Sequence, residues 1–164
     1  MLIEKINEDI KKAMQERNEL SLLVLRGVNA AIHNKEIEKR TKLSKEEKDI
    51  KKLEELSKLT DEEILEAVNS EAKKRKEAII EFEKGGRKDL LGKEKKELEI
   101  LKKYLPEQMD EAQIKEEAQK AIKESGAARP QDTGRVMSVL MPKLKGRADG
   151  GLVSKIVTEL LNSL

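Results

Sequence analysis

The sequence predicts an all-α protein built from two small helical bundles, and three observations support this prediction. Asp, Glu, Lys and Arg make up 41% of the 164 residues, which is typical of long solvated helices. Apolar residues recur every three or four positions along nearly the whole chain, as they do in amphipathic helices. Only Phe82 and Tyr104 are aromatic, whereas a β-sandwich or barrel needs aromatic and β-branched residues on its pleated faces.

Apolar spacing alone predicts the first two helices. One covers residues 2–14, and the next runs from about Leu20 to Lys39 and begins with four consecutive aliphatic residues. Ala30 and Ala31 on the second helix allow close approach of a neighbour. The Lys- and Glu-rich stretch 42–58 that follows could be either a mobile helix or a linker.

Two capping boxes mark the next helices, because a Ser or Thr with a Glu three residues later satisfies the first amides of a helix. Ser44 with Glu47 predicts a short helix that carries the apolar residues of 50–59. Thr60 with Glu63 predicts a longer helix. We expect it to end at the two glycines 85 and 86, where φ can be positive, and a further helix to cover residues 88–105.

Pro106 divides the chain, because the residue before a proline is pushed out of the α region. We therefore expect an N-terminal helical subdomain, residues 1–104, and a C-terminal three-helix subdomain, residues 107–164. The three helices of the second subdomain have predicted boundaries. The first helix begins at a capping box of Asp110 and Gln113 and ends at Ser125 and Gly126. The second bends or ends near Pro142, and the third begins at Asp149 as its N-cap.

Composition excludes several kinds of site. Without cysteine there is no disulfide, thiolate nucleophile or Cys-ligated zinc. The single histidine, His33, cannot form a multi-His metal site, and two aromatic residues cannot form a base-stacking platform. No nucleophile, base and orienting group occur together, so we expect no catalytic residue, no metal and no cofactor.

The chain carries no sign of secretion or membrane insertion. Its first residues lack a basic segment followed by an apolar one, and its longest aliphatic run, Leu22–Leu25, is far shorter than the roughly 20 residues of a membrane span. We expect a cytoplasmic protein without membrane contact. The net charge of +2 gives no general attraction to nucleic acid.

Local basic clusters are therefore the candidate binding sites. The turn before residue 90 contains Arg87 and Lys88. In one interpretation these two side chains contact phosphate. In the other, the turn is a hairpin corner in which Arg87 pairs with Asp89 or Glu94. The run 73–76 is also basic, but successive helical residues point 100° apart, so a solvated face is preferred.

The glycine-rich turn 143–151 is the strongest candidate, because it begins a helix whose N-terminus attracts anions. Against this interpretation, Asp149 as N-cap would already satisfy those amides. The basic residues of this candidate site are Lys143, Lys145, Arg147 and Lys155, with Arg135 added if the three helices pack compactly.

Two stretches are more specific than helical patterning requires. The first runs from Lys73 through the Gly-Gly-Arg-Lys-Asp-Leu-Leu turn to Tyr-Leu-Pro-Glu-Gln at 104–108. The second consists of Gly134–Met137, then Leu144–Gly150 and the final helix. Together with Leu25-Arg26 and Ala30–Ile32, they resemble the YqeY family. That family is similar to the helical tail of GatB, a subunit of the amidotransferase that handles Asp-tRNA(Asn) and Glu-tRNA(Gln).

The resemblance implies two helical bundles joined near Pro106, and a contact with tRNA or with a tRNA-dependent amidotransferase or aminoacyl-tRNA complex. It does not imply amidotransferase chemistry, because the chain has no room for the kinase-like and glutaminase parts of that enzyme. A label of carbon–nitrogen ligase activity with glutamine as amido-N-donor would be inherited from the family.

Three hypotheses follow. The first is a non-catalytic module that binds tRNA, or a tRNA-processing complex, through the turn near Arg147. The second is an adaptor that docks on a partner protein through an exposed apolar stripe of the 50–59 or 152–161 helix. The third, least favoured, is an enzyme that acts on tRNA-linked substrates.

Overall fold

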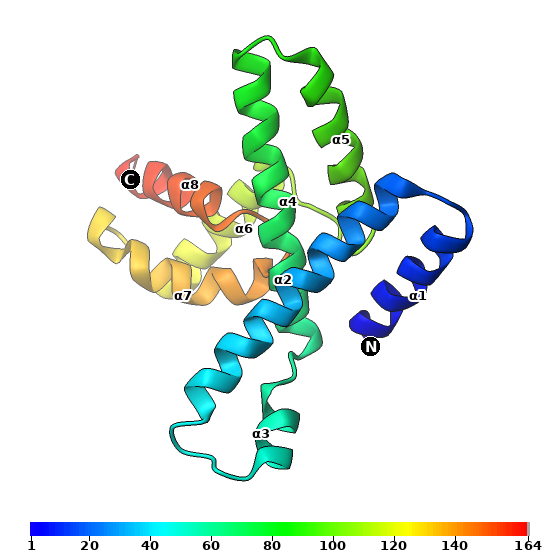
Figure 1. Cartoon of the computed structure of the whole chain (residues 1–164). Coiled ribbons are helices and arrows are strands. Elements are labelled where there is room, and N and C mark those ends of the chain that lie inside the picture. The colour runs from blue at the N-terminus through cyan, green and yellow to red at the C-terminus, as the bar shows by residue number, and fades with distance from the viewer. Residues whose placement is uncertain (164) are drawn as a thin grey trace. The chain divides into compact units, whose positions relative to one another are not determined.

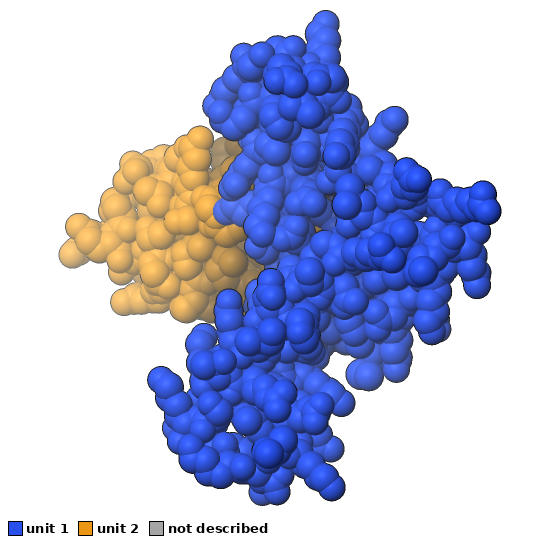
Figure 2. All heavy atoms as spheres, in the orientation of Figure 1, with its two compact units in different colours: residues 1–104 blue, residues 105–164 orange. Residues whose placement is uncertain are grey.

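The computed structural model describes residues 1–163. Within that range it contains eight α-helices, one short 3₁₀ helix and no strand, so the predicted all-α class is confirmed (Figure 1). The chain divides into two compact units, residues 1–104 (unit 1) and residues 105–164 (unit 2), which are coloured separately in Figure 2.

Unit 1 contains five helices, and α2 contacts each of the other four. Their bounds are α1, Leu2–Gln15; α2, Glu19–Leu43; α3, Ile50–Ser57; α4, Asp61–Lys84; and α5, Lys88–Lys102. The core between them is aliphatic and includes Ile6, Leu25, Val28, Ile64, Val68 and Leu101. The long helix α2 therefore serves as the common surface on which unit 1 is packed.

One of the predicted capping boxes in unit 1 is confirmed and one is wrong. Thr60 and Glu63 exchange main-chain to side-chain hydrogen bonds of 2.8 and 3.3 Å at the start of α4. Ser44 instead follows the last turn of α2, and its amide donates to the Arg40 carbonyl at 2.9 Å. Because α2 extends past residue 39, α3 begins only at Ile50, with Asp49 as its N-cap.

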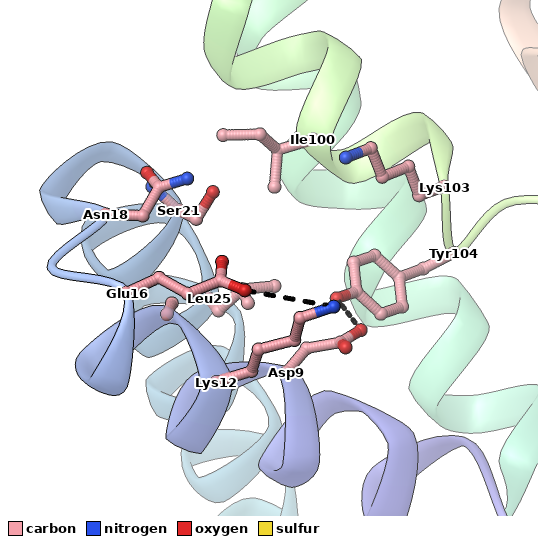
Figure 3. Close-up of a pocket in the computed structure, with 10 residues that line it drawn as sticks. Asp9, Lys12, Glu16, Asn18, Ser21, Leu25, Ile100, Lys103 and Tyr104 are labelled. Carbon is pink, nitrogen blue, oxygen red and sulfur yellow. Dashed lines mark hydrogen bonds and ion pairs between the residues drawn. The ribbon is translucent and has the colours of Figure 1, made fainter.

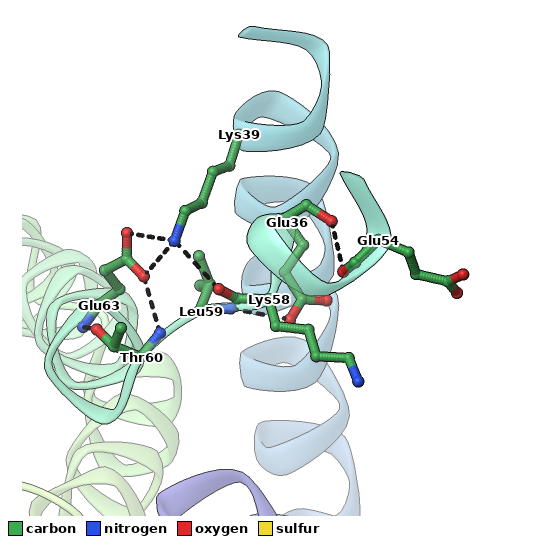
Figure 4. Close-up of polar contacts among 8 residues, drawn as sticks. Glu36, Lys39, Glu54, Lys58, Leu59, Thr60 and Glu63 are labelled. Carbon is green, nitrogen blue, oxygen red and sulfur yellow. Dashed lines mark hydrogen bonds and ion pairs between the residues drawn. The ribbon is translucent and has the colours of Figure 1, made fainter. Parts of the chain in front are cut away.

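Lys39 fixes the connection between α3 and α4 to the side of α2 (Figure 4). Its ammonium group donates to both carboxylate oxygens of Glu63, at 2.8 and 3.0 Å, and to the Lys58 carbonyl at 3.1 Å. The hydrogen bond from Lys39 lowers the pKa of Glu63. Glu36 accepts a further bond from the Leu59 amide at 3.3 Å. Residues 50–60 are thus a short helix and an anchored turn, and the linker interpretation of this part is wrong.

A charge cluster lies between α4 and α5. Arg75 donates to Glu71 on its own helix at 2.9 Å and to Glu97 on α5 at 3.2 Å. Glu71 and Glu97 are only 9% and 5% exposed, and carboxylates buried this deeply need a cationic partner. Glu71 has a second one, the Lys74 ammonium at 2.6 Å, whereas Arg75 is the cation shared by both. The solvated face expected for the run 73–76 is therefore wrong at Arg75, which points toward α5.

Tyr104 ties the end of α5 to α1 (Figure 3). Its hydroxyl donates to Asp9 at 2.5 Å. The Lys5 ammonium lies 5.4 Å from the ring centroid. Burial raises the pKa of Tyr104, and the hydrogen bond to Asp9 raises it further. The ring lines a hollow of about 190 Å³ beside α1 and α2. The hydroxyl of Tyr104 thus serves to join the segment after α5 to α1.

Unit 2 is a three-helix arrangement in which every helix contacts the other two. Its elements are α6, Glu111–Ser125; the 3₁₀ helix η1, Pro130–Asp132; α7, Thr133–Leu144; and α8, Gly150–Asn162. Its core includes Ile114, Ala118, Ala121, Val136, Leu140, Leu144, Val153 and Val157.

The predicted boundaries in unit 2 are largely confirmed. Asp110 and Gln113 form the capping box of α6, and Gly126 ends that helix with φ of 64°. Helix α7 includes Pro142 and ends two residues later, at Leu144, so the predicted end near Pro142 is confirmed. The side chain of Leu144 is buried in the core of the unit, which holds the last turn of α7 in place.

The cluster around Arg75 leads to a stability prediction. Replacing Arg75 with Met leaves two buried carboxylates without their shared cation, and we expect it to lower the free energy of unfolding by about 3 kcal/mol. Urea denaturation followed by circular dichroism measures this difference. The matched control is Lys84→Met on the same helix, whose pair with Glu81 is exposed and whose loss should change stability by less than about 0.5 kcal/mol. Equal effects of the two substitutions would contradict the assignment.

Candidate nucleic-acid interface

The α7–α8 loop, residues 145–149, folds back on the last turn of α7. The amides of Arg147 and Ala148 both donate to the Leu144 carbonyl, at 2.9 and 3.2 Å. Gly146 takes a φ of 75°, which favours glycine. Asp149 accepts a hydrogen bond from the Leu152 amide at 3.0 Å, so its predicted role as the N-cap of α8 is confirmed.

A second segment, residues 106–109, holds this loop from the other side. The Gln108 side-chain amide donates to the Gly146 carbonyl at 2.7 Å and to the Pro106 carbonyl at 3.0 Å. The Met109 amide donates to the Arg147 carbonyl at 2.8 Å. The main chain of the loop is thus fixed on both sides, while the side chain of Arg147 stays exposed.

Gln108 is not among the site residues predicted from the sequence. Both residues of this contact, Gln108 and Gly146, lie in the stretches that carry the family resemblance. The two stretches meet here across 38 residues of chain. Nothing in local spacing indicates such a contact. Only the coincidence of two specific motifs within the second predicted subdomain could have suggested it.

Acidic residues of α6 face Lys143, in the last turn of α7, and Arg147, in the α7–α8 loop. Lys143 pairs with Glu124 at 2.7 Å. The pKa of Glu117 is lowered, first by its hydrogen bond from Lys120 and also by the positive charges of Lys143 and Arg147. Lys143 and Arg147 therefore act on one common acidic side chain, and part of their positive charge is compensated within unit 2.

The other predicted residues of this unit lie at different places: Arg135 and Lys155 on helices, and Lys145 at the start of the loop. Arg135 lies in the first turn of α7, 3.8 Å from Asp132. It precedes Lys143 by eight residues, about 12 Å along the helix axis, so it lies at the end of α7 opposite the loop. Lys155 lies within α8, 3.9 Å from Glu159. Lys145 follows α7 directly and is exposed.

Arg87 and Lys88 belong to the hairpin turn of unit 1. Arg87 is the N-cap residue of α5, and its guanidinium donates two hydrogen bonds to Asp89, at 3.3 and 3.2 Å. This is the hairpin-corner arrangement weighed from the sequence. The pair lowers the pKa of Asp89 and raises that of Arg87. Gly86 makes the turn with φ of 67°, and Lys88 is exposed beside it.

Residues 1–163 contain no group of three or more His, Asp and Glu side chains placed to hold a metal ion. No helix within the same residues is long and apolar enough to cross a membrane.

These features define a class of protein: two all-α units, the second of which carries a braced basic loop. A sequence model of the Yqey-like protein family matches residues 3–161, so the chain belongs to the YqeY family. The resemblance inferred from its motifs is thereby confirmed.

Curated relatives carry the name "Altered inheritance of mitochondria protein 41, mitochondrial". The protein from Pyrenophora tritici-repentis is 29% identical over 168 residues, which cover 99% of this chain and 82% of that protein. The Kluyveromyces lactis and Lachancea thermotolerans proteins are 35% and 34% identical, over 62% and 63% of this chain. The match spans 47% of each of these two relatives.

These names contradict the cytoplasmic location expected from the sequence, because all three relatives are described as mitochondrial. The expectation was based on the absence of secretory and membrane signals. That absence does not distinguish the cytosol from another aqueous compartment, since a charged helical surface is compatible with either.

The bracing of the α7–α8 loop can be tested by removing the Gln108 amide. We expect Gln108→Ala to lower the free energy of unfolding by about 1 to 2 kcal/mol, because the carbonyls of Gly146 and Pro106 lose a partly buried donor. Thermal unfolding followed by circular dichroism measures the change. Gln119→Ala, on the exposed surface of α6, is the matched control and should unfold as the unaltered protein does. A Gln108→Ala protein as stable as this control would show that the bracing is energetically unimportant.

Proposed function

We propose that this YqeY-family chain is a non-catalytic helical module that binds RNA, with tRNA as the expected class, through the α7–α8 loop of unit 2. The observation that carries the proposal is the bracing of that loop. Two main-chain carbonyls, those of Gly146 and Arg147, are held by hydrogen bonds from residues 108 and 109. A guanidinium presented from a fixed backbone loses less conformational freedom when it binds phosphate.

The chemistry of the loop supports a phosphate contact over base recognition. Lys143, Lys145 and Arg147 are exposed cations close together in the sequence. Lys143 also pairs with Glu124 at 2.7 Å, and the Arg147 Nε donates to the Glu107 carbonyl at 3.4 Å. Asp149 caps the N-terminus of α8. No aromatic residue follows Tyr104 in the sequence, so unit 2 cannot stack bases on an aromatic ring. Such a surface reads the backbone and shape of RNA and not its sequence.

The family resemblance supports the choice of tRNA and of a tRNA-dependent amidotransferase or aminoacyl-tRNA complex as the wider partner. Within such a complex the chain contributes positioning and not bond formation. Glutamine-dependent amide formation by the isolated chain would overturn the non-catalytic part of the proposal.

RNA binding has a clear dependence on salt and charge. We expect weak binding of bulk tRNA at about 50 mM salt that is largely lost at about 200 mM, because phosphate contacts release counterions. Arg147→Glu should weaken binding about tenfold and flatten the salt dependence. Fluorescence anisotropy with labelled tRNA measures both.

Lys115→Glu provides the control for this experiment. It makes the same change of charge on an exposed position of α6, in the same unit but outside the loop. Binding that is absent at about 50 mM salt, or that responds equally to the two substitutions, would contradict the proposal.

A second candidate function is favoured by an exposed apolar surface on α3. Ile50 and Leu56 are 70% and 52% exposed, although both belong to a helix of only eight residues. Large apolar side chains displayed on a short helix are typical of surfaces that dock on another protein. This observation supports the adaptor hypothesis for unit 1 and is compatible with RNA binding by unit 2.

The adaptor hypothesis predicts a protein complex that survives nuclease treatment. Affinity purification of the full chain after nuclease digestion should retain a stoichiometric partner, and the double substitution Ile50→Asp with Leu56→Asp should release it. The control is Ile80→Asp, since Ile80 on α4 is similarly exposed at 51%. Loss of all partners on nuclease treatment would contradict an RNA-independent adaptor.

A further inference from the structure

The helices α1 and α2 of unit 1 lie side by side (Figure 1). A groove of about 440 Å³ runs between them. It lies on different elements from the α7–α8 loop. Polar side chains from both helices line it. Asn7 comes from α1, and Arg26, Asn29 and His33 come from α2.

The spacing of the α2 residues places them on one face of the helix. Arg26, Asn29 and His33 follow one another at intervals of three and four, which returns to nearly the same direction at 100° per residue. Asn7 approaches from the neighbouring helix. Two amides, a guanidinium and an imidazole thus border one groove, and all four can donate hydrogen bonds.

These four side chains are not used to hold the described part of the protein together. Unlike Arg75 and Arg87, which are each paired with carboxylates, Arg26 has no carboxylate of residues 1–163 within 4.0 Å. The side chains of Asn7, Asn29 and His33 likewise form no hydrogen bond with that part of the chain.

One acidic residue also lines the groove. Glu36 lies at one end, where its carboxylate accepts a hydrogen bond from the Leu59 amide at 3.3 Å. Figure 4 shows this carboxylate beside Leu59, in the anchored turn before α4. Glu36 still contributes a negative charge at that end of the groove. The feature that favours an anion is therefore the guanidinium of Arg26, which is not paired with a carboxylate of residues 1–163, and not the net charge of the groove.

The remaining lining is small or apolar. Ile3 and Ala30 border the groove, and Ile32, which is buried in the core, also contributes to its wall. Small-molecule sites typically combine such a surface with a few convergent polar groups, in volumes of roughly 300 to 1,000 Å³. The groove fits an anionic group attached to an organic moiety better than a bare inorganic ion.

Core packing does not explain the residues that face the groove. Leu25 and Ile32 are buried, but Arg26 and Ala30, which lie close to them in the sequence of α2, are exposed. The proposed function of the α7–α8 loop does not use them either, because they lie in the other unit.

We infer that the α1–α2 groove binds a phosphate ester, whose oxygens accept hydrogen bonds from Arg26, Asn29, His33 and Asn7. Arginine and side-chain amides are suited to this role, since a guanidinium can bind two phosphate oxygens at once. The phosphate belongs either to a free mononucleotide or to an RNA chain, and the two sources present the same group to the groove.

The experiment is a titration of the full-length, isotope-labelled protein followed by amide chemical shifts. The probes are adenosine monophosphate and a short single-stranded RNA, each at low salt. We expect saturable shifts at residues of α1 and α2 that line the groove. Arg26→Gln should weaken this binding about tenfold or more, because it removes a charged hydrogen-bond donor.

Two controls separate this inference from other effects. Lys51→Gln removes an exposed positive charge from α3 and should leave the groove shifts unchanged. Arg147→Glu alters the proposed RNA-binding loop and should also leave the mononucleotide shifts in the groove unchanged. The two proposals can thus fail independently. The unchanged melting temperature expected of Arg26→Gln would show that the variant is folded.

The two probes distinguish the sources of phosphate. Saturation by the mononucleotide identifies a small-molecule site, and saturation by RNA alone identifies a contact with the nucleic-acid backbone. The inference is overturned if neither probe produces saturable shifts in the groove, or if Arg26→Gln and Lys51→Gln have the same effect.

Discussion

The guanidinium of Arg75 lies between the carboxylates of two buried glutamates, Glu71 on α4 and Glu97 on α5, and so joins the two helices. These two helices form the most extensive helix pair of unit 1. Two buried negative charges would repel each other and oppose that packing without a cation between them. Apolar contacts make the helix pair stable, and the ionic cluster specifies how the two helices align.

The same principle applies wherever the aliphatic core ends. Lys39 anchors the turn before α4 to the side of α2, and Gln108 anchors the α7–α8 loop to the segment before α6. In both places a single long polar side chain donates to a main-chain carbonyl of a connection, that of Lys58 in one case and that of Gly146 in the other. A protein with 41% charged residues and two aromatic ones thus uses side-chain hydrogen bonds to position connections that a larger core would hold by packing.

Local patterns predicted the helices well, because helical spacing and capping depend on residues within one or two turns. The Thr60 and Asp110 capping boxes and the Asp149 N-cap were found in this way. Ser44 was misassigned, since the hydroxyl that can begin one helix can equally lie at the end of another. For the candidate site, the sequence located the basic residues of the α7–α8 loop. It could not find Gln108 or the acids of α6 that face Lys143, because those contacts join segments far apart in the chain.

The position of Tyr104 makes unit 1 separately observable. It is the only tyrosine, tryptophan is absent, and the second aromatic residue, Phe82, also belongs to the first 104 residues. The near-ultraviolet absorbance and aromatic circular dichroism of the protein therefore arise almost entirely from a phenol hydrogen-bonded to Asp9 on α1. The helical signal in the far ultraviolet, by contrast, comes from both units. An unlabelled sample therefore gives two independent signals. The near-ultraviolet signal reports on the contact of Tyr104 with α1, and the far-ultraviolet signal reports on the helix content of both units.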